Sequence, residues 1–144
     1  MNKSQIAVSC FNNGFNCSQA VFSAFSPELG IPETAAFKIA CPFGAGMGRM
    51  QETCGAVTGA FMVIGLKHGK SNTDEERLKQ LSYDLVNKFT EMFRERNKTI
   101  KCRDLIGMDI STREGLQKAR DMGLFTSLCA KYVRDAVEII EIIL

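Results

Sequence analysis

The chain contains one almost unbroken apolar run, Cys54 to Leu66, in which Thr58 is the only polar residue. The run is shorter than the roughly 20 residues that a membrane-spanning helix needs, so we expect it to be buried within a protein core. A helix that is apolar on nearly every side lies at the centre of a fold, because no side of it suits water. We therefore predict a central helix over about residues 52–68, and no membrane span.

The rest of the chain shows helical spacing of apolar residues and no sustained alternation of the kind that marks strands. Asn16 is a good N-cap, and Thr73 with Glu76 and Ser111 with Glu114 have the spacing of capping boxes. The predicted helices are Lys3–Phe11, Cys17–Phe25, Pro32–Ala40, a long helix after Thr73, one after Ser111, and Ser127–Ile143. We predict an all-α fold: one domain over residues 1–144, a bundle of about six to seven helices around the apolar central helix.

Composition narrows the classes of function. The formal net charge is +2, so no broad basic surface points to nucleic acid. Residues Met1 to Cys10 lack the apolar stretch of a signal peptide. We therefore expect a cytoplasmic protein.

Six cysteines are the distinctive residues of the chain, which has only one histidine. A framework of structural disulfides is not expected in a reducing compartment. No Cys-x-x-Cys pair occurs, so neither a thioredoxin-like motif nor a zinc-knuckle spacing is present. No Cys-x-x-Cys-His occurs either, so covalent c-type haem is not expected. Any cysteine site would be assembled from separate helices.

Two cysteines lie where a helix start lowers a thiol pKa: Cys17 after the Asn16 cap, and Cys54 in the first turn of the central helix. Cys102 lies between Lys101 and Arg103, which also favours a thiolate, and Cys129 faces inward on the last helix. The alternative for each cysteine is that it is a small buried hydrophobic residue.

Glycines mark two further positions. Gly55 and Gly59 lie inside the central helix, where each costs about 1 kcal/mol relative to alanine. Close approach of a second helix or of a ligand would offset that cost. Before this helix, Gly44, Gly46 and Gly48 with Arg49 could form a backbone site for an anion. The alternative for these glycines is a tight turn.

Several segments together resemble one family: Asn16 to Ala20, Phe43 to Arg49, Cys54 to Ala60, Cys102 and Cys129. They are similar to redox-active proteins of the CGAxxG type, and the resemblance covers nearly the whole chain. The family pattern is four cysteines and the motif CGAxxG. The resemblance implies that Cys17, Cys54, Cys102 and Cys129 form the redox set, and that Cys10 and Cys41 are packing residues. A related branch binds haem, but this chain lacks the attachment motif.

Three hypotheses remain open at this point. The first is thiol–disulfide or electron-transfer chemistry, with Cys54 as the attacking thiolate, Cys17 as its partner, and Cys102 and Cys129 as a second pair or relay. The second is a metal site in which the same four thiolates hold zinc or an iron–sulfur cluster. The third is a non-catalytic helical module, with the isoleucine-rich end, Val137–Leu144, forming a homodimer surface. The redox partner, and whether the protein is an enzyme, stay open.

Overall fold

The computed structural model describes all residues 1–144. It contains seven helices of at least seven residues and no strands, which confirms the predicted all-α fold. These helices are α1 (Lys3–Asn12), α2 (Cys17–Phe25), α3 (Glu33–Ala40), α5 (Gly55–His68), α6 (Glu76–Asn97), α8 (Arg113–Asp121) and α9 (Ala130–Ile143). Short elements join them: α4 (Gly44–Met47), α7 (Cys102–Ile106), 3-10 turns at Pro27–Leu29 and Cys41–Phe43, and a π turn at Phe125–Cys129.

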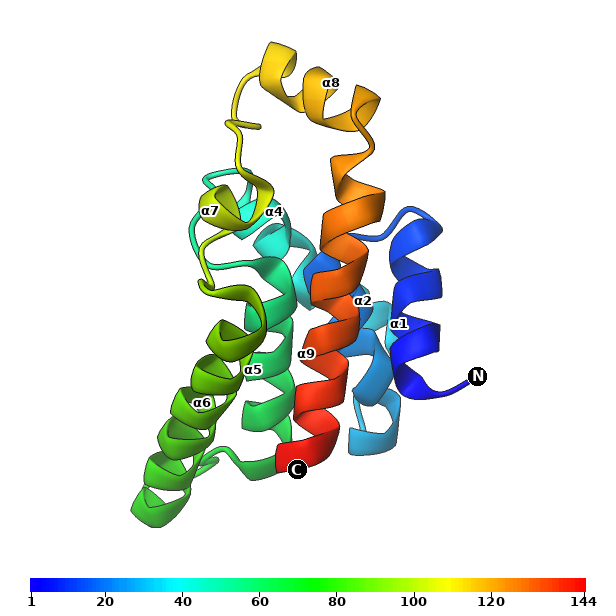
Figure 1. Ribbon diagram of the computed structural model, residues 1–144. Coiled ribbons are helices and arrows are strands. Elements are labelled where there is room, and N and C mark those ends of the chain that lie inside the picture. Colours follow the sequence, from blue (N-terminus) through cyan, green and yellow to red (C-terminus); the bar gives the residue numbers. More distant parts are fainter.

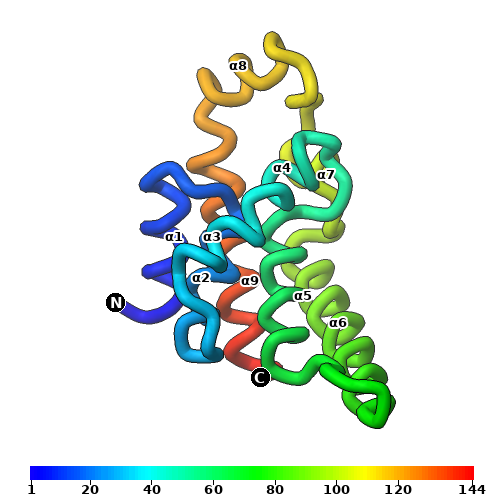
Figure 2. The backbone as a smooth tube through the Cα atoms, turned by 180° about the vertical axis from the view of Figure 1, so that it is seen from behind, coloured from blue at the N-terminus to red at the C-terminus, as the bar shows by residue number.

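Helix α9 runs through the middle of the bundle, with α1 and α2 on one side and α5 and α6 on the other (Figure 1). Seen from behind, α3 lies against α2 (Figure 2). At one end of the bundle, α8 stands away from the main body, and α4 and α7 lie close together below it (Figure 1). The two chain ends lie toward the opposite end of the bundle.

The predicted apolar helix is α5, and it packs against α2, α6 and α9. It buries Ala56, Val57, Ala60, Val63 and Ile64 in the main core, as its composition predicts. Helix α5 begins at Gly55 rather than near residue 52, because residues before it are extended. Thr53 forms an isolated antiparallel bridge with Lys101, which takes these residues out of the helix.

Both predicted capping boxes are wrong. The Asp109 carboxylate accepts hydrogen bonds from both the amide and the hydroxyl of Ser111, so Ser111 does not cap the helix. Thr112 caps α8 instead, because its hydroxyl accepts from the Gly115 amide at 3.0 Å. Helix α6 begins at Glu76 without a side-chain cap. The sequence also did not predict α7, which is too short to show a period.

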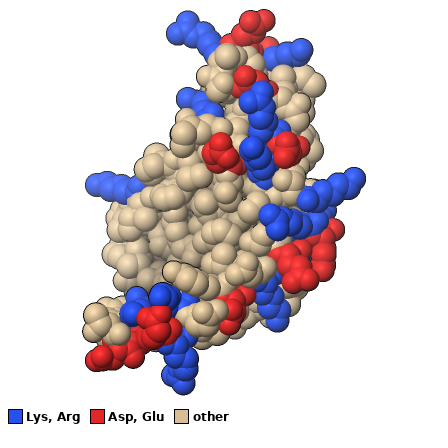
Figure 3. Space-filling view, turned by 90° about the vertical axis from the view of Figure 1, so that its left-hand side faces the viewer, with Lys and Arg blue, Asp and Glu red and all other residues tan.

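The isoleucine-rich end, Val137–Leu144, is partly buried in its own chain, and a homodimer surface there stays a prediction. Val137, Ile139 and Ile140 are fully buried in the core of their own chain, while Ile142 is exposed. On the face shown in Figure 3, positive and negative side chains lie close together at the top, at the bottom and along the right-hand side, next to a broad area without charge. None of the helices combines the length and the apolar character that a membrane crossing requires.

Candidate functional site

Four of the six cysteines line one cavity of about 450 Å³. They are Cys17, Cys54, Cys102 and Cys129, and all four are buried free thiols. The resemblance selected this same set from segments far apart in the sequence. The cavity is open at one side, and its walls are mainly apolar, with Leu105, Ile106, Ile110, Leu116, Phe125 and Tyr132 among the residues that line it.

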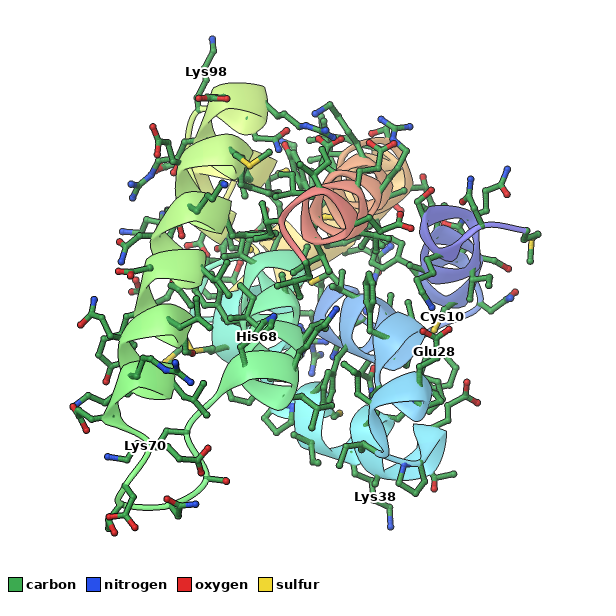
Figure 4. All side chains as sticks on the ribbon, turned by 90° about the horizontal axis from the view of Figure 1, so that it is seen from below. Cys10, Glu28, Lys38, His68, Lys70 and Lys98 are labelled. Atoms are coloured by element: carbon green, nitrogen blue, oxygen red, sulfur yellow. The ribbon has the colours of Figure 1, made fainter.

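The other two cysteines lie away from this cavity. Cys10 is half-buried on α1, where its sulfur lies 4.0 Å from the Ser23 hydroxyl of the neighbouring α2 (Figure 4). Cys41 is exposed in the 3-10 turn that follows α3, so the expectation that it is a packing residue is wrong. Proline at the next position turns the chain there and leaves the Cys41 side chain in solvent.

Cys17 is the first residue of α2, as the Asn16 cap predicts. The Asn16 side chain accepts from the Gln19 amide at 3.0 Å, and the Gln19 side chain accepts from the Asn16 amide at 2.9 Å. Asn16 also donates from its side-chain nitrogen to the Cys41 carbonyl at 2.9 Å. This reciprocal capping box holds the chain where the sulfur of Cys17 faces the unpaired amides of the helix start.

The pKa of Cys17 is lowered to about 7, chiefly by a hydrogen bond from the Cys54 thiol. Burial acts in the opposite direction, since it disfavours the charged sulfur. Amides of Ala45, Ser18 and Cys17 itself add hydrogen bonds that favour the thiolate. A buried sulfur is thereby about half ionised at pH 7.

Cys54 is the partner that keeps its proton in this structure, whereas the sequence ranked Cys54 as the attacking thiolate. The pKa of Cys54 is raised, by its hydrogen bond to Cys17, by burial and by the charge on Cys17. The physical reason is local: Cys54 is the N-cap of α5 rather than a first-turn residue, and its side chain makes no capping bond. Only the Ala56 amide favours its thiolate, whereas Cys17 has three amides.

The glycines of the motif allow α2 and α5 to approach closely, which confirms the close approach predicted for them. A methyl group at Gly55 would collide with the sulfur of Cys17 and lie 3.0 Å from the Phe43 carbonyl oxygen. A methyl group at Gly59 would lie 2.8 Å from the Ser18 carbonyl oxygen. The backbone of α5 therefore forms part of the wall against which the Cys17 thiol rests.

A short pairing of extended segments brings Cys54 and Cys102 to the same wall. The Cys54 amide donates to the Ile100 carbonyl at 2.7 Å, and the Cys102 amide donates to the Glu52 carbonyl at 2.7 Å. These bonds flank the bridge between Thr53 and Lys101. The backbone therefore fixes the two cysteines relative to each other, although nearly fifty residues separate them in the sequence.

Cys102 and Cys129 are neutral thiols at pH 7. Burial raises the pKa of Cys102 to about 12, and it also raises the pKa of Cys129. The basic flanks of Cys102 were expected to favour its thiolate, but Lys101 and Arg103 extend into solvent. Their charges are screened by water, whereas the sulfur is desolvated, so burial determines the direction.

The glycine-rich segment forms a left-handed turn in which five consecutive residues have positive φ. Three of them are not glycines: Ala45 (57°), Met47 (66°) and Arg49 (68°). Each such residue costs about 1–2 kcal/mol relative to right-handed backbone. Gly44, Gly46 and Gly48 are not among the residues lining the cavity, while Ala45 and Arg49 are. The Ala45 amide is directed at Cys17, so in this structure the anion that the turn serves is the Cys17 thiolate.

Gln51 anchors this turn, and no sequence signal pointed to it. It is buried with a φ of 56°, and its side-chain nitrogen donates to the Met108 carbonyl at 2.8 Å. Its side-chain oxygen accepts from the Ile110 amide at 2.9 Å. Gln51 is also a hydrogen-bond partner of Cys102. It thus joins the turn to the segment that carries Cys102.

The arrangement of the thiols suits proton sharing between two sulfurs better than metal coordination. No group of three or more cysteine, histidine or acidic side chains is placed so that it could hold a metal ion. By contrast, Cys17 and Cys54 are near enough for each thiol to shift the pKa of the other.

The sequence model of one known family matches residues 15–143. Its description is "Putative redox-active protein (C_GCAxxG_C_C)". The chain belongs to this family. The C_GCAxxG_C_C pattern names four cysteines, which is the number that line the cavity. No curated protein and no solved structure matches the chain.

Proposed function

We propose that this C_GCAxxG_C_C protein is a thiol–disulfide redox protein in which Cys17 is the attacking thiolate and Cys54 is the resolving thiol. One observation carries the proposal: Cys17 and Cys54 line the same cavity and shift each other's pKa, with Cys17 favoured as the thiolate. An attacking thiol reacts best when its pKa is near the ambient pH, because it is then both ionised and a good nucleophile. The pKa of Cys17, about 7, meets that condition.

The reaction takes place in two exchange steps. The Cys17 thiolate attacks one sulfur of a substrate disulfide, forms a mixed disulfide and releases the other sulfur as a thiolate. Cys54 gives its proton to that thiolate and attacks the Cys17 sulfur, which forms the Cys17–Cys54 disulfide and releases the second half of the substrate. Two electrons pass from the protein to the substrate. One half of the substrate leaves as a thiol with the proton of Cys54, and the other leaves as a thiolate that takes a proton from water. The reverse sequence would reduce the protein.

Cys102 and Cys129 form the second pair in this proposal. Both carry raised pKa values and line the same cavity, so they react more slowly than Cys17 at neutral pH. A charge on Cys17 raises the pKa of both thiols, and a charge on Cys102 raises the pKa of Cys129, so the three sulfurs lie near one another. Their role is thiol–disulfide exchange with the Cys17–Cys54 disulfide, which is thereby reduced while Cys102 and Cys129 form a disulfide.

Oxidation of the reduced protein with one equivalent of dithiodipyridine tests the proposal. Cys10 and Cys41 are first replaced by serine, because neither lines the cavity and Cys41 is exposed. We expect two thiols released per protein, and a peptide map showing a Cys17–Cys54 disulfide. In the Cys54→Ser variant the reaction should stop at the mixed disulfide on Cys17. In the Cys17→Ser variant the fast phase of the reaction with dithiodipyridine should be absent. A map without the Cys17–Cys54 bond would refute this pairing and favour the role of a non-catalytic module.

The convergence of four thiols on one cavity also supports a second candidate, a four-cysteine site for zinc or an iron–sulfur cluster. That site requires the sulfurs to move together, since no three of them are placed to hold a metal in this structure. Metal analysis and absorption spectra of protein prepared without oxygen test this candidate. About one zinc per chain, or a visible cluster spectrum that is lost in Cys102→Ser, would favour it over thiol exchange.

A further inference from the structure

The cavity that contains the four sulfurs has the size and lining of a site for a small molecule. Its volume of about 450 Å³ lies in the range of ligand pockets, and hydrophobic residues make up 13 of the 20 that line it. Aromatic rings come from separate elements: Phe11 and Phe15 near α1, Phe125 before α9, and Tyr132 within α9. Such walls favour a flat, apolar ligand body over a polar peptide segment.

Apart from the Cys17 thiolate, the charged groups of the lining are positive. Arg49 and Arg120 line the cavity, and no aspartate, glutamate or lysine does. Neither arginine takes part in any of the ion pairs of the protein. Arg49 is held by the left-handed turn, and Arg120 lies in the last turn of α8. Two unpaired guanidinium groups beside apolar walls favour an anionic ligand, since the fork of an arginine suits a carboxylate.

From these two features, we infer that the substrate is a small disulfide that joins an apolar, aromatic body to a negatively charged group. The inference rests on the proposed function for the exchange at Cys17, and it adds the class of molecule that enters. The apolar body lies along the aromatic walls, the anionic group pairs with Arg49 or Arg120, and the disulfide reaches the Cys17 thiolate. Exchange then follows the two steps given above, with two small thiols as the products.

The first test compares two aromatic disulfides that differ in charge, the dianionic dithiobis(nitrobenzoate) and the neutral dithiodipyridine. The measured quantity is the ratio of their second-order rate constants at Cys17, in the chain that lacks Cys10 and Cys41. Arg49→Gln with Arg120→Gln should lower this ratio about ten-fold, the low end of electrostatic effects on association rates. Arg113→Gln is the matched control, because Arg113 lies on α8 outside the cavity lining, and it should leave the ratio unchanged. The inference would be overturned if the ratio fell equally in the double variant and in the Arg113→Gln control, or if it did not fall in the double variant.

A second test does not depend on disulfide formation. Anilinonaphthalene sulfonate joins an aromatic body to an anion, and we expect it to protect Cys17 from N-ethylmaleimide in the native chain. Exposed Cys41 is the internal reference and should be labelled at its usual rate. Loss of protection in the double arginine variant supports the inference, and absence of protection in the native chain contradicts it. If the ligand protects Cys17 but oxidation with dithiodipyridine yields no Cys17–Cys54 disulfide, the inferred class of ligand is supported and the proposed exchange chemistry is rejected.

Discussion

Gly55→Ala removes the space in which the Cys17 sulfur lies, and its effect on reactivity follows from the structure. The added methyl group collides with that sulfur, which must leave the Cys54 thiol and the Ala45 amide. We expect the pKa of Cys17 to rise from about 7 toward the ordinary value of 9.0. At pH 7 the thiolate fraction then falls about 50-fold. The less acidic thiolate is about 6- to 10-fold more nucleophilic, so the net loss of rate is about 5- to 8-fold.

The same substitution has a separate effect on stability. Alanine is favoured over glycine within a helix by about 1 kcal/mol, and overpacking a close helix contact costs about 1–3 kcal/mol. Gly65→Ala is the matched control, because Gly65 lies in the same helix with nothing within 4 Å of an added methyl group. Gly55→Ala should therefore be about 1–3 kcal/mol less stable than Gly65→Ala in urea unfolding.

The assay for reactivity is the rate of iodoacetamide alkylation at Cys17 from pH 5 to 10, followed by peptide mapping. The native chain and Gly65→Ala should show a midpoint near pH 7, and Gly55→Ala a midpoint closer to 9. Above pH 9 the order should invert, because the variant thiol is then ionised and more nucleophilic. If Gly55→Ala keeps both the native pH profile and the stability of Gly65→Ala, the reasoning about this contact is refuted.

Two further predictions concern the cap of α2 and the pH dependence of folding. Asn16→Ala should cost about 1–2 kcal/mol, more than Asn2→Ala in the similar capping box of α1, because the extra bond of Asn16 reaches the distant Cys41 carbonyl, whereas that of Asn2 comes from Ser4 in its own helix. Equal losses in urea unfolding would contradict this. Stability should rise between pH 7 and 9, where Cys17 is ionised in the folded chain and still protonated in the unfolded chain. Stability should fall above pH 9, because Cys54, Cys102 and Cys129 ionise in the unfolded chain but stay protonated in the folded chain. Urea midpoints that do not change from pH 7 to 10 would contradict both pKa shifts.

The sequence predicted those helices and caps that depend only on residues close together in the chain. Asn16 caps α2 as expected, because its side chain has no competitor for the amide it bonds. Ser111 fails as a cap because Asp109, two residues earlier, already holds it. The apolar run predicted α5 but not its first residue, since the pairing of Thr53 with Lys101 is a long-range contact. Periodicity could not reveal this competition between distant segments.

The set of four cysteines followed from the resemblance, whereas their order of reactivity did not. A helix start favours a thiolate at both Cys17 and Cys54 when each is considered alone. The difference in pKa between them depends on tertiary contacts, chiefly the interaction of the two thiols and, to a smaller extent, the Ala45 amide of the left-handed turn. Glycines indicated a turn at this place but not its hand, because Ala45 and Arg49 adopt a conformation that their side chains disfavour. The buried anchor Gln51 is also a property of the tertiary structure alone.

The contact of α1 and α2 with α9 joins the beginning of the chain to its end, and this affects how the protein matures. Synthesis proceeds from the N-terminus, so Cys17 and Cys54 leave the ribosome well before the helix that covers them. Until α9 docks, the cavity lacks the wall to which Tyr132 belongs, and the sulfurs are more exposed to solvent. The nascent chain is therefore the stage most prone to mispaired oxidation. A reducing environment during synthesis protects the thiols until the last helix has folded against the first.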